Sequence, residues 1–469
     1  MIPIVTPEDM GAIDRAAPEP VEVLIGRAGA AVARAALDLL GGAYGRRVVV
    51  VAGKGNNGND GREAARRLRQ RGVSVRIIDA ADRPESIEAC DLVIDAAYGT
   101  GFRGDYRAPV VRDGVPVLAV DIPSGIDGLT GALPSGPEAR VLLADRTVTF
   151  AALKPGLVLQ PGASYHGDID LVDIGLDVPS ASSWLVEADD VRAWLPERDP
   201  STHKWQTAVW VVAGSPGMDG AAALVSAGAQ RSGAGYVRLS MPGGGVDAPH
   251  VPVEVVRTAL PAEGWAAQVV DGLDRVAAVV VGNGIGTEEG TAEQVRQLIS
   301  SLAGRDREPT VVVDADGITA LGRSARDLVG SNMILTPHDG EYARLAGGRP
   351  PADRLAAARD LAGQLGCVVL LKGGPTVIAD PDGKVLVVDS GDARLATAGT
   401  GDVLAGIIGG LAAQGLDPMR AAAAGAFLHG QAGDLGWRHG LVAGDLPALL
   451  PAVLDRLDAA STSSGPPDT

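Results

Sequence analysis

The sequence predicts an α/β protein with two domains. Short apolar segments rich in β-branched residues alternate with longer helical segments in both halves of the chain. This alternation is interrupted once, over residues 176–200, where Pro, Ser and acidic residues mix. A chain of 469 residues is also too long for one ordinary hydrophobic core. Because continuous apolar strands that alternate with helices form parallel sheets, we expect each sheet to be covered by helices on both faces.

The elements expected in each half follow from these alternating segments. In the first half we expect strands at 47–52, 73–78, 91–95, 116–120, 146–150 and 168–173, and helices at 21–40 and 59–71. In the second half we expect strands at 208–213, 236–240, 277–281, 310–313, 333–335, 367–371, 376–379 and 385–388, and helices at 219–232, 289–302, 353–365, 401–413 and 418–434. One short helix is expected in the interruption, at 189–194. The two halves show no repeat, so we expect two different domains.

The interruption gives the expected domain boundary. We expect one domain at 1–190 and a second at 191–460. Residues 461–469 are small, polar and Pro-rich, and this composition predicts a disordered tail.

Composition excludes several classes of protein. The net charge of −17 argues against a nucleic-acid binder, which needs a basic surface. The N-terminus lacks the basic and apolar regions of a signal peptide, and no run of 18 apolar residues predicts a membrane span, so we expect a cytoplasmic protein. Cys90 and Cys367 are the only thiols, and both are expected to be inert core residues.

Two glycine-rich turns indicate where ligands bind. The first, at 53–61, follows the apolar strand 48–52, and the second, at 398–402, precedes a helix of small residues. Each turn leads into the start of a helix, where backbone N–H groups and the helix dipole favour phosphate. The two turns therefore suggest two nucleotide-handling domains.

Three further segments of the first half are expected to meet the first turn. Residues 95–104, 121–128 and 154–156 each follow a strand, and the carboxyl ends of parallel strands meet at one edge of the sheet. Their Asn, Asp and Ser oxygens suit a hard cation. The alternative is that these side chains form Asx-turns and satisfy only the local backbone.

In the second half, the glycine turn at 398–402 contains the hydroxyl of Thr400 and the carboxylate of Asp402. Backbone donors there could hold the charge that develops in phosphoryl transfer, while Asp402 accepts a proton. The alternative is a capped helix that packs closely through its glycines. The turns at 372–376 and 336–341 also follow strands and favour a site. His338 could be structural, but its place in a Pro/Gly turn favours a functional role.

The motifs of the first half resemble the NAD(P)HX epimerase domain. The family's Gly-x-Gly-Asn-Asn-Gly, Asp-x-x-x-Gly-Thr-Gly, Asp-Ile-Pro-Ser-Gly and Lys-Pro-Gly motifs occur in this order within 1–190, although Asn59 replaces a family glycine and Gly26 a family acidic residue. The resemblance implies a potassium ion bound by Asn57, Asp95 and Ser124, and acid–base work by Asp121. It also implies that the hydrated nicotinamide nucleotide contacts Asn56, Asn57, Gly58, Asn59, Asp60, Gly99, Thr100, Gly101, Phe102, Arg103, Gly104, Asp105 and Asp121.

The motifs of the second half resemble the ADP-dependent NAD(P)HX dehydratase domain, a ribokinase-like fold. They are His203-Lys204, 214–222, 231–235, 282–286, 314–316, 336–341, 372–376 and 399–402. The resemblance implies substrate contacts from Ala221, Gly286, His338 and Asp402. It implies contacts to AMP or ADP from Lys372, Gly373, Gly374, Pro375, Thr376 and Gly401. Each domain is then expected to be a three-layer αβα structure, Rossmann-like in the first half and ribokinase-like in the second.

Together the two resemblances imply a bifunctional repair enzyme. It would epimerise the R and S hydrates NADHX and NADPHX, and dehydrate the S form with ADP as phosphoryl donor, with Mg²⁺ and K⁺ as cofactors. Asp402 would take the proton of the C6 hydroxyl. The resemblance also suggests a homo-oligomer. Two alternatives remain open at this point: a vitamin-precursor kinase, because related enzymes share the Gly-x-Gly-Asp turn, and a non-catalytic nucleotide-binding scaffold.

Overall fold

The computed structural model describes residues 1–178, 181–197, 200–244, 250–303 and 309–463 of the chain. It divides into two compact units, and each is described by itself. The first unit comprises residues 2–183, and the second comprises Met1 and residues 184–469. No helix in these described ranges is both long and apolar enough to cross a membrane.

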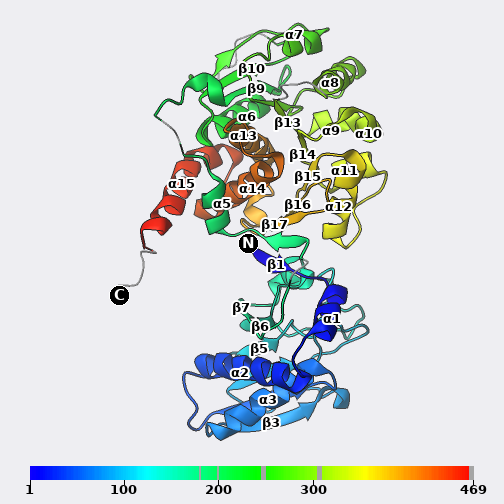
Figure 1. The fold of residues 1–469 in the computed structure, drawn as a ribbon, viewed down its shortest axis with the longest axis vertical. Coiled ribbons are helices and arrows are strands. Elements are labelled where there is room, and N and C mark those ends of the chain that lie inside the picture. Colours follow the sequence, from blue (N-terminus) through cyan, green and yellow to red (C-terminus); the bar gives the residue numbers. More distant parts are fainter. Residues whose placement is uncertain (179–180, 198–199, 245–249, 304–308, 464–469) are drawn as a thin grey trace. The chain divides into compact units, whose positions relative to one another are not determined.

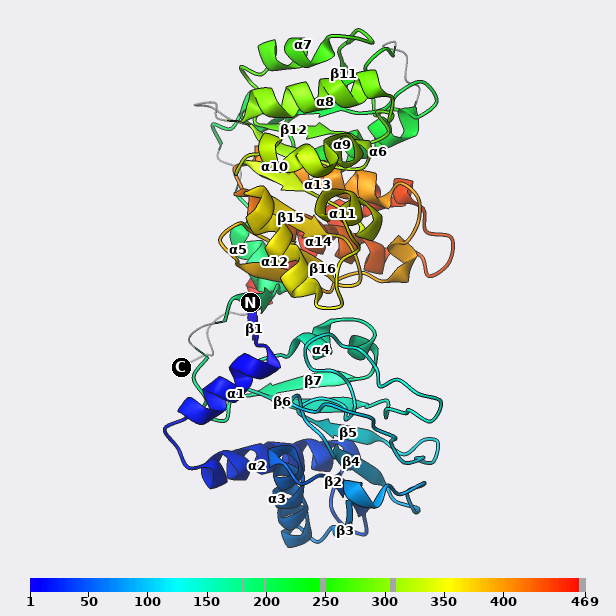
Figure 2. The same cartoon turned by 90° about the vertical axis from the view of Figure 1, so that its right-hand side faces the viewer.

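The first unit is built on a six-stranded parallel sheet with the strand order β3-β2-β4-β5-β6-β7 (Figure 2). The six strands of this sheet are β2 (Arg47–Ala52), β3 (Ser74–Asp79), β4 (Leu92–Ala96), β5 (Val117–Val120), β6 (Arg146–Phe150) and β7 (Asp168–Val172), and the short strand β1 (Ile2–Ile4) lies outside it. The helices are α1 (Pro7–Ala16), α2 (Val21–Leu40), α3 (Asn56–Gln70) and α4 (Pro155–Val158).

The two faces of this sheet bury alternate residues of each strand. On one face, Val48 and Val50 of β2 pack in a cluster with residues of α2 and α3. On the other face, Val49 and Val51 pack with Tyr106 and other residues of the connecting segments. Helices α2 and α3 lie side by side (Figures 1 and 2), and they are so close that a Cβ on Gly29 would be 2.5 Å from the Glu63 side chain.

The chain changes direction in the sheet at β2. It runs from β2 outward to β3 on one side and then to β4 on the other side of β2. In open α/β sheets, ligands bind beyond the carboxyl ends of the strands at such a switch point. The glycine turn that follows β2 and the Asp95 carboxylate at the end of β4 both lie there.

The second unit contains a larger mixed sheet with the strand order β8-β17-β16-β15-β14-β13-β12-β9-β10-β11. These strands are β8 (Ser183–Leu185), β9 (Ala208–Val212), β10 (Tyr236–Ser240), β11 (Val256–Arg257), β12 (Ala278–Val281), β13 (Thr310–Val313), β14 (Met333–Leu335), β15 (Val368–Leu371), β16 (Thr376–Ala379) and β17 (Val385–Val388). Strands β9 to β15 pair in parallel, whereas β16 pairs antiparallel with β15 and β17. Here the switch point lies between β9 and β12.

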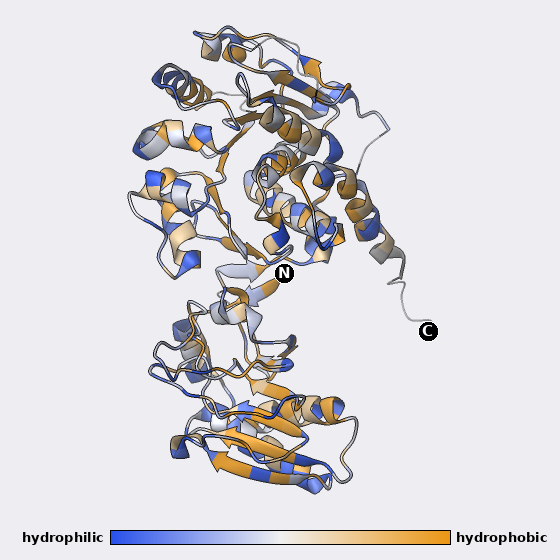
Figure 3. Ribbon diagram, turned by 180° about the vertical axis from the view of Figure 1, so that it is seen from behind, coloured by the Kyte–Doolittle hydropathy of each residue, from blue (hydrophilic) through white to orange (hydrophobic). Residues whose placement is uncertain are grey.

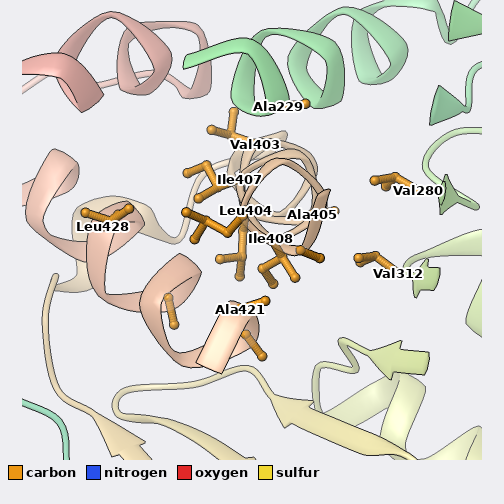
Figure 4. Packing of buried hydrophobic residues seen from close by; sticks show 14 of the residues in the cluster. Ala229, Val280, Val312, Val403, Leu404, Ala405, Ile407, Ile408, Ala421 and Leu428 are labelled. Atoms are coloured by element: carbon orange, nitrogen blue, oxygen red, sulfur yellow. The ribbon is translucent and has the colours of Figure 1, made fainter. Parts of the chain in front are cut away.

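Helices cover both faces of this second sheet (Figures 1 and 2). They are α5 (Ala188–Trp194), α6 (Asp219–Arg231), α7 (Trp265–Asp271), α8 (Glu289–Leu302), α9 (Asp316–Leu321), α10 (Ala325–Leu328), α11 (Asp339–Ala346), α12 (Arg354–Leu365), α13 (Thr400–Ala413), α14 (Pro418–Leu435) and α15 (Leu446–Ser463). Helix α13 is the central helix of its layer. Figure 4 shows it between Val280 and Val312 of the sheet, Ala229 of α6, and Ala421 and Leu428 of α14.

Small residues let α13 approach its neighbours closely. A Cβ on Gly406 would be 2.1 Å from the carbonyl oxygen of Val225 in α6, and one on Gly409 would be 2.4 Å from Val280 of β12. The strands beneath are strongly hydrophobic (Figure 3). This packing fixes the N-terminus of α13 above the carboxyl edge of the sheet.

The predicted α/β fold class with two domains is confirmed, and most predicted strands match observed ones within one residue. The expected helical layer on the second face of the first sheet is not observed, because the described residues that pack on that face belong to connecting segments and not to α-helices. Helix α3 begins at Asn56, three residues earlier than predicted, so the Asn-rich segment is the first turn of the helix. The predicted tail begins too early, because Ser461–Ser463 continue α15, and the remainder of it lies outside the described residues.

Candidate active sites

The first unit contains a cavity of about 740 Å³ at the switch point of its sheet. Of the predicted contact residues, Asn56, Asn57, Asp60, Gly99, Thr100, Gly101, Phe102 and Asp121 line it. Gly58, Asn59, Arg103, Gly104 and Asp105 are not among the lining residues. Gly58 instead packs against the turn itself, where a Cβ would be 1.9 Å from the Gly53 carbonyl oxygen. Because Asn59 does not line the cavity, the replacement of the family glycine by Asn59 does not narrow the cavity directly.

The start of α3 presents unpaired backbone donors to this site. Gly55 is the N-cap residue and provides no side-chain hydrogen bond to the helix. The first N–H groups of an α-helix have no intrahelical acceptor, so they are available for an anion.

Asp121 and Lys154 form the charged centre of the cavity. Lys154 Nζ lies 2.6 Å from Asp121 Oδ1, and the lysine side chain is only 1% exposed. Lys154 also donates hydrogen bonds to Thr149 Oγ1 at 2.9 Å and to the Phe150 carbonyl oxygen at 3.1 Å. The backbone N–H of Thr100 donates to Asp121 Oδ2 at 3.0 Å. Asp121 is therefore held by Lys154 and Thr100, from two separate segments of the unit, while it faces the cavity.

Asp60 is a second carboxyl group of this cavity. It is 8% exposed, and burial, followed by the charges of Asp121 and Asp14, raises its pKa to about 8. A carboxyl group with this pKa is mostly protonated at neutral pH and can donate a hydrogen bond. Asp14 of α1 also lines the cavity, and sequence reasoning missed it because α1 was not predicted.

The three predicted potassium ligands are the hydrogen-bonded pair Asp95 and Ser124, and Asn57 in the first turn of α3. Asp95 and Ser124 are fully buried, and the Ser124 N–H donates to Asp95 Oδ2 at 2.9 Å. Both amide atoms of Asn57 are buried without a hydrogen-bond partner in the described part of the chain. Burial raises the pKa of Asp95, although hydrogen bonds from Ser124 oppose the rise. An orphaned amide oxygen and a buried carboxylate are oxygen donors of the kind that fits a potassium ion.

In the second unit, three side chains from separate strand ends and one from the start of a helix form one hydrogen-bonded network. Asn283 follows β12, Asp314 follows β13, Lys372 follows β15, and Asp402 lies in the first turn of α13. Asn283 Nδ2 donates to Asp402 Oδ1 at 2.8 Å and to Asp314 Oδ2 at 3.0 Å. Lys372 Nζ donates to Asp314 Oδ1 at 2.7 Å. A Cβ on Gly401 would be 3.7 Å from Lys372 Nζ, so the glycine turn faces this network.

Burial and neighbouring charges shift the pKa values of Asp402 and Lys372 in this network. Burial raises the pKa of Asp402, the hydrogen bond from Asn283 opposes this, and the charge of Asp314 adds to it. Although burial opposes the charge on Lys372, the carboxylates of Asp314 and Glu341 raise its pKa. Burial also raises the pKa of Glu341, which lies 3.6 Å from Lys372 Nζ.

The N-terminus of α13 is open in the same way as that of α3. Its N-cap residue, Gly399, has a φ of 93° and makes no side-chain hydrogen bond to the helix. Thr400 Oγ1 donates instead to the carbonyl oxygens of Leu395 and Thr397, at 2.7 and 2.9 Å. These bonds hold the turn, and the Thr400 N–H itself donates to the Thr397 carbonyl oxygen at 3.3 Å. The N–H groups of Gly401 and Asp402, which follow in the first turn and have no intrahelical acceptor, can bind a ligand.

His338 has a structural role at the start of α11. Its Nδ1 accepts hydrogen bonds from the N–H groups of Gly340 and Glu341, at 2.9 and 3.3 Å, and Glu341 accepts one from the His338 N–H in return. The ring is still 57% exposed, and its Nε2 lies 3.5 Å from Glu341. The side chain is therefore anchored through one nitrogen and reachable from solvent.

The remaining predicted residues of the second unit lie near this edge. A Cβ on Gly284 would be 2.9 Å from the Cβ of Ala221, and the Gly286 N–H donates to Asp316 Oδ2 at 3.0 Å. The turn at 372–376 is tied to Arg354, which donates to the Lys372 carbonyl oxygen at 2.9 Å. Asn283, Asp314 and Glu341 were not among the predicted contact residues. The available signals were the positions of Asn283 and Asp314 just after apolar strands, and the motifs at 282–286, 314–316 and 336–341 that contain the three residues.

These two units define the class of the protein: an α/β enzyme with two ligand sites, each at the switch point of a sheet and each combining an open helix N-terminus with a lysine–carboxylate pair. Family models match both units. A model described as NAD(P)H-hydrate dehydratase matches residues 209–454, and one described as YjeF-related protein N-terminus matches 21–89 and 78–156.

Curated relatives identify the family. The bifunctional NAD(P)H-hydrate repair enzyme Nnr of Moorella thermoacetica is 37% identical, with 97% of each chain covered. The enzyme of the same name from Mycobacterium tuberculosis is 41% identical, with 82% of each chain covered. The chain belongs to the family of bifunctional NAD(P)H-hydrate repair enzymes.

Among solved structures, a ribokinase-like superfamily protein from Enterococcus faecalis is similar to this chain with a TM-score of 0.50. It is 19% identical and covers 60% of this chain and 98% of its own. At this identity, the likeness supports the ribokinase-like fold alone.

Proposed function

We propose that this chain repairs hydrated nicotinamide nucleotides in two steps. The first unit interconverts the R and S epimers of NADHX and NADPHX, and the second converts the S epimer to NAD(P)H with ADP as phosphoryl donor. The observation that carries the proposal is that both charged networks, Asp121–Lys154 and Asp402–Asn283–Asp314–Lys372, occur in one chain of this family.

The second unit would perform the dehydration by phosphoryl transfer. The C6 hydroxyl of the hydrate is a poor leaving group. Asp402 accepts its proton while the hydroxyl oxygen attacks the terminal phosphorus of ADP, which releases AMP. The C6–O bond then breaks to release phosphate, and loss of the C5 proton restores the double bond of NAD(P)H. The N–H groups at the start of α13 and the Lys372 ammonium would stabilise the charge on the transferring group.

Several predicted contact residues have an assigned place in this reaction. Lys372 to Thr376 and Gly401 would contact the adenylate, and Ala221, Gly286 and His338 the hydrated nucleotide. Within the described ranges, no three His, Cys, Asp or Glu side chains form a group that could hold a metal ion. We therefore expect Mg²⁺ to enter with the phosphates of ADP, where it would neutralise their charge.

The first unit would perform acid–base chemistry at C6. Asp121 faces the cavity and is held by Lys154, so it is placed to take the proton of the C6 hydroxyl of the bound hydrate. The C6–N1 bond would then open as C6 becomes a carbonyl carbon, and addition of N1 to the opposite face, with return of the proton to oxygen, would give the other epimer. The open start of α3 would hold the phosphates of the same nucleotide. Asn57, Asp95 and Ser124 would bind K⁺, whose charge would balance the buried carboxylate of Asp95.

The direct test is recovery of absorbance at 340 nm from a mixture of R- and S-NADHX with ADP, Mg²⁺ and K⁺. The proposal predicts complete recovery at a rate above spontaneous epimerisation. Recovery of the S fraction alone would contradict the epimerase assignment, and no recovery with ADP or ATP would contradict the dehydratase assignment. A homo-oligomer and a cytoplasmic location are part of the proposal, and light scattering and cell fractionation test them.

A further inference from the structure

The second unit contains a buried amide that joins two carboxylates. Asn283 is fully buried, and its Nδ2 lies within 3.0 Å of Asp314 and Asp402 at once. Asp402 and Asn283 are 119 positions apart in the sequence. The bond therefore connects the end of β12 to the first turn of α13 across the switch point of the sheet.

The hydrogen-bonding capacity of an amide fixes how Asn283 is oriented. An amide nitrogen carries two protons, and here each proton has its own carboxylate acceptor. The reversed amide would direct its oxygen at two carboxylates and lose both bonds. The Oδ1 of Asn283 has no partner within the described ranges, so the residue is held by its donors. A side chain with both donors engaged keeps Asp314 and Asp402 at a fixed separation.

This contact matters because no cation of the described residues forms an ion pair with Asp402. The lysine of the network, Lys372, donates to Asp314, and its next nearest carboxylate is that of Glu341. Besides burial, the groups that shift the pKa of Asp402 are the amide of Asn283, the like charges of Asp314 and Asp316, and the charge of Lys372. The amide is the only one of these groups with a hydrogen bond to Asp402 among the described residues.

We propose that Asn283 is a positioning residue of the dehydratase site, whose side-chain amide holds the proton-accepting carboxylate of Asp402 against Asp314 and aims its free oxygen at the substrate hydroxyl. This inference rests on the proposed function of the second unit. It adds a residue that acts on the reaction through Asp402, and it predicts how the rate depends on pH. Loss of the amide removes the hydrogen bond that opposes the raised pKa of Asp402, while burial and the Asp314 charge remain.

The test compares Asn283→Ala, Asn283→Ser and Asn283→Asp in the full chain. Wild-type turnover of pure S-NADHX with ADP is measured first, so that failure of the proposed function is seen before any variant is made. For Asn283→Ala we expect kcat to fall roughly tenfold or more, with a much smaller change in KM, because the proton acceptor is misplaced. The acid limb of the kcat profile should also move to higher pH. Asn283→Ser, which retains one donor, should lie between the wild type and Asn283→Ala.

The isosteric variant Asn283→Asp separates the effect of hydrogen-bond donation from the effect of side-chain shape. Asn283→Asp keeps the side-chain volume but replaces the donor by a third carboxyl group. It should lose more activity than Asn283→Ala, because like charges then face each other around Asp402. If Asn283→Ala does not fold, Asn283→Asp and Asn283→Ser still carry the test.

Asn332→Ala is the matched control. Asn332 lies at the opposite, amino edge of the sheet, where its Nδ2 donates to the Pro309 carbonyl oxygen at 2.8 Å and its Oδ1 has no partner among the described residues. The Asn332→Ala variant should be less stable than the wild type, but the dependence of its kcat on pH should not change. The proposal is overturned if the Asn283 variants keep wild-type kcat. It is equally overturned if they lose kcat with an unmoved acid limb, as a merely structural role would require.

Discussion

The two sites use a buried lysine in different ways. In the first unit, Lys154 is paired at 2.6 Å with Asp121, the carboxylate proposed to transfer the proton. In the second, Lys372 is paired at 2.7 Å with Asp314, and the proposed proton acceptor Asp402 is held by a neutral amide. The comparison shows how the same residue types set different properties. A direct ion pair holds the first carboxylate in place. In the second unit, burial and the charge of Asp314 raise the pKa of Asp402, as suits a general base, and the hydrogen bond from Asn283 opposes this rise.

The largest expected effect is at Asp402. Asp402→Asn should reduce the dehydration of S-NADHX by roughly a hundredfold or more, because the amide cannot accept the hydroxyl proton. Epimerisation by the same chain should not change. The measurement is single-epimer turnover at 340 nm, with Asp382→Asn, an exposed carboxylate of the same unit, as control. Near-normal turnover would remove Asp402 from its assigned role.

The corresponding change in the first unit is Lys154→Met. Epimerisation should fall roughly a hundredfold, because Asp121 loses the cation that holds it. Breaking a buried ion pair should also lower the free energy of unfolding of this unit by about 3–5 kcal/mol. Epimer exchange followed by NMR and calorimetry of the full chain would measure the two effects. Unchanged exchange would mean that the lysine only supports the fold.

A smaller effect is expected at the potassium site. Asn57→Ala removes an amide whose atoms have no protein partner among the described residues, so it should abolish the response of epimerisation to K⁺ and lower the rate roughly tenfold. The rate is compared in KCl and in a matched tetramethylammonium salt. An undiminished K⁺ response would contradict the assignment of Asn57 as a ligand.

The smallest effect concerns stability, at Asp60. Its pKa is raised to about 8, so the folded state keeps a proton that the unfolded chain releases near pH 4. The contribution of this group is therefore fully present below the unfolded pKa and is lost as the pH rises toward 8. Asp60→Asn should stabilise the first unit at pH 8, by at most a few kcal/mol, and the gain should vanish toward pH 4.

Calorimetry between pH 4 and pH 9 measures this gain. Asp38→Asn, an exposed position of α2, should show none. A gain at Asp60 that does not vary with pH would contradict the raised pKa.

The sequence predicted what depends on local pattern. The strands were predicted closely because runs such as Val48–Val51 are buried on both sides of a parallel sheet, and continuous apolar runs are typical of such strands. The glycine turns were predicted because they break these runs at helix starts. Helix α11 was missed because its N-cap is His338, which is not among the usual capping residues.

The missed residues of the second site depend on tertiary structure. Asn283 donates to a residue 119 positions away, and no local pattern indicates that contact. Asp60 was predicted as a contact residue, but its raised pKa arises from burial and from Asp14 and Asp121, which the fold brings near it. The sequence shows that Asn283 and Asp60 follow strands, but it does not show which residues the fold brings into contact with them.

The central claim is that two separate sites in one chain perform consecutive steps, and a complementation assay tests it most directly. Asp121→Asn and Asp402→Asn chains are each given a mixture of R- and S-NADHX with ADP, Mg²⁺ and K⁺, alone and mixed in equal amounts. The account predicts rapid recovery of only the S fraction by Asp121→Asn, no recovery by Asp402→Asn, and complete recovery by the mixture. Rapid recovery of both epimers by Asp121→Asn alone, or recovery by Asp402→Asn, would contradict it.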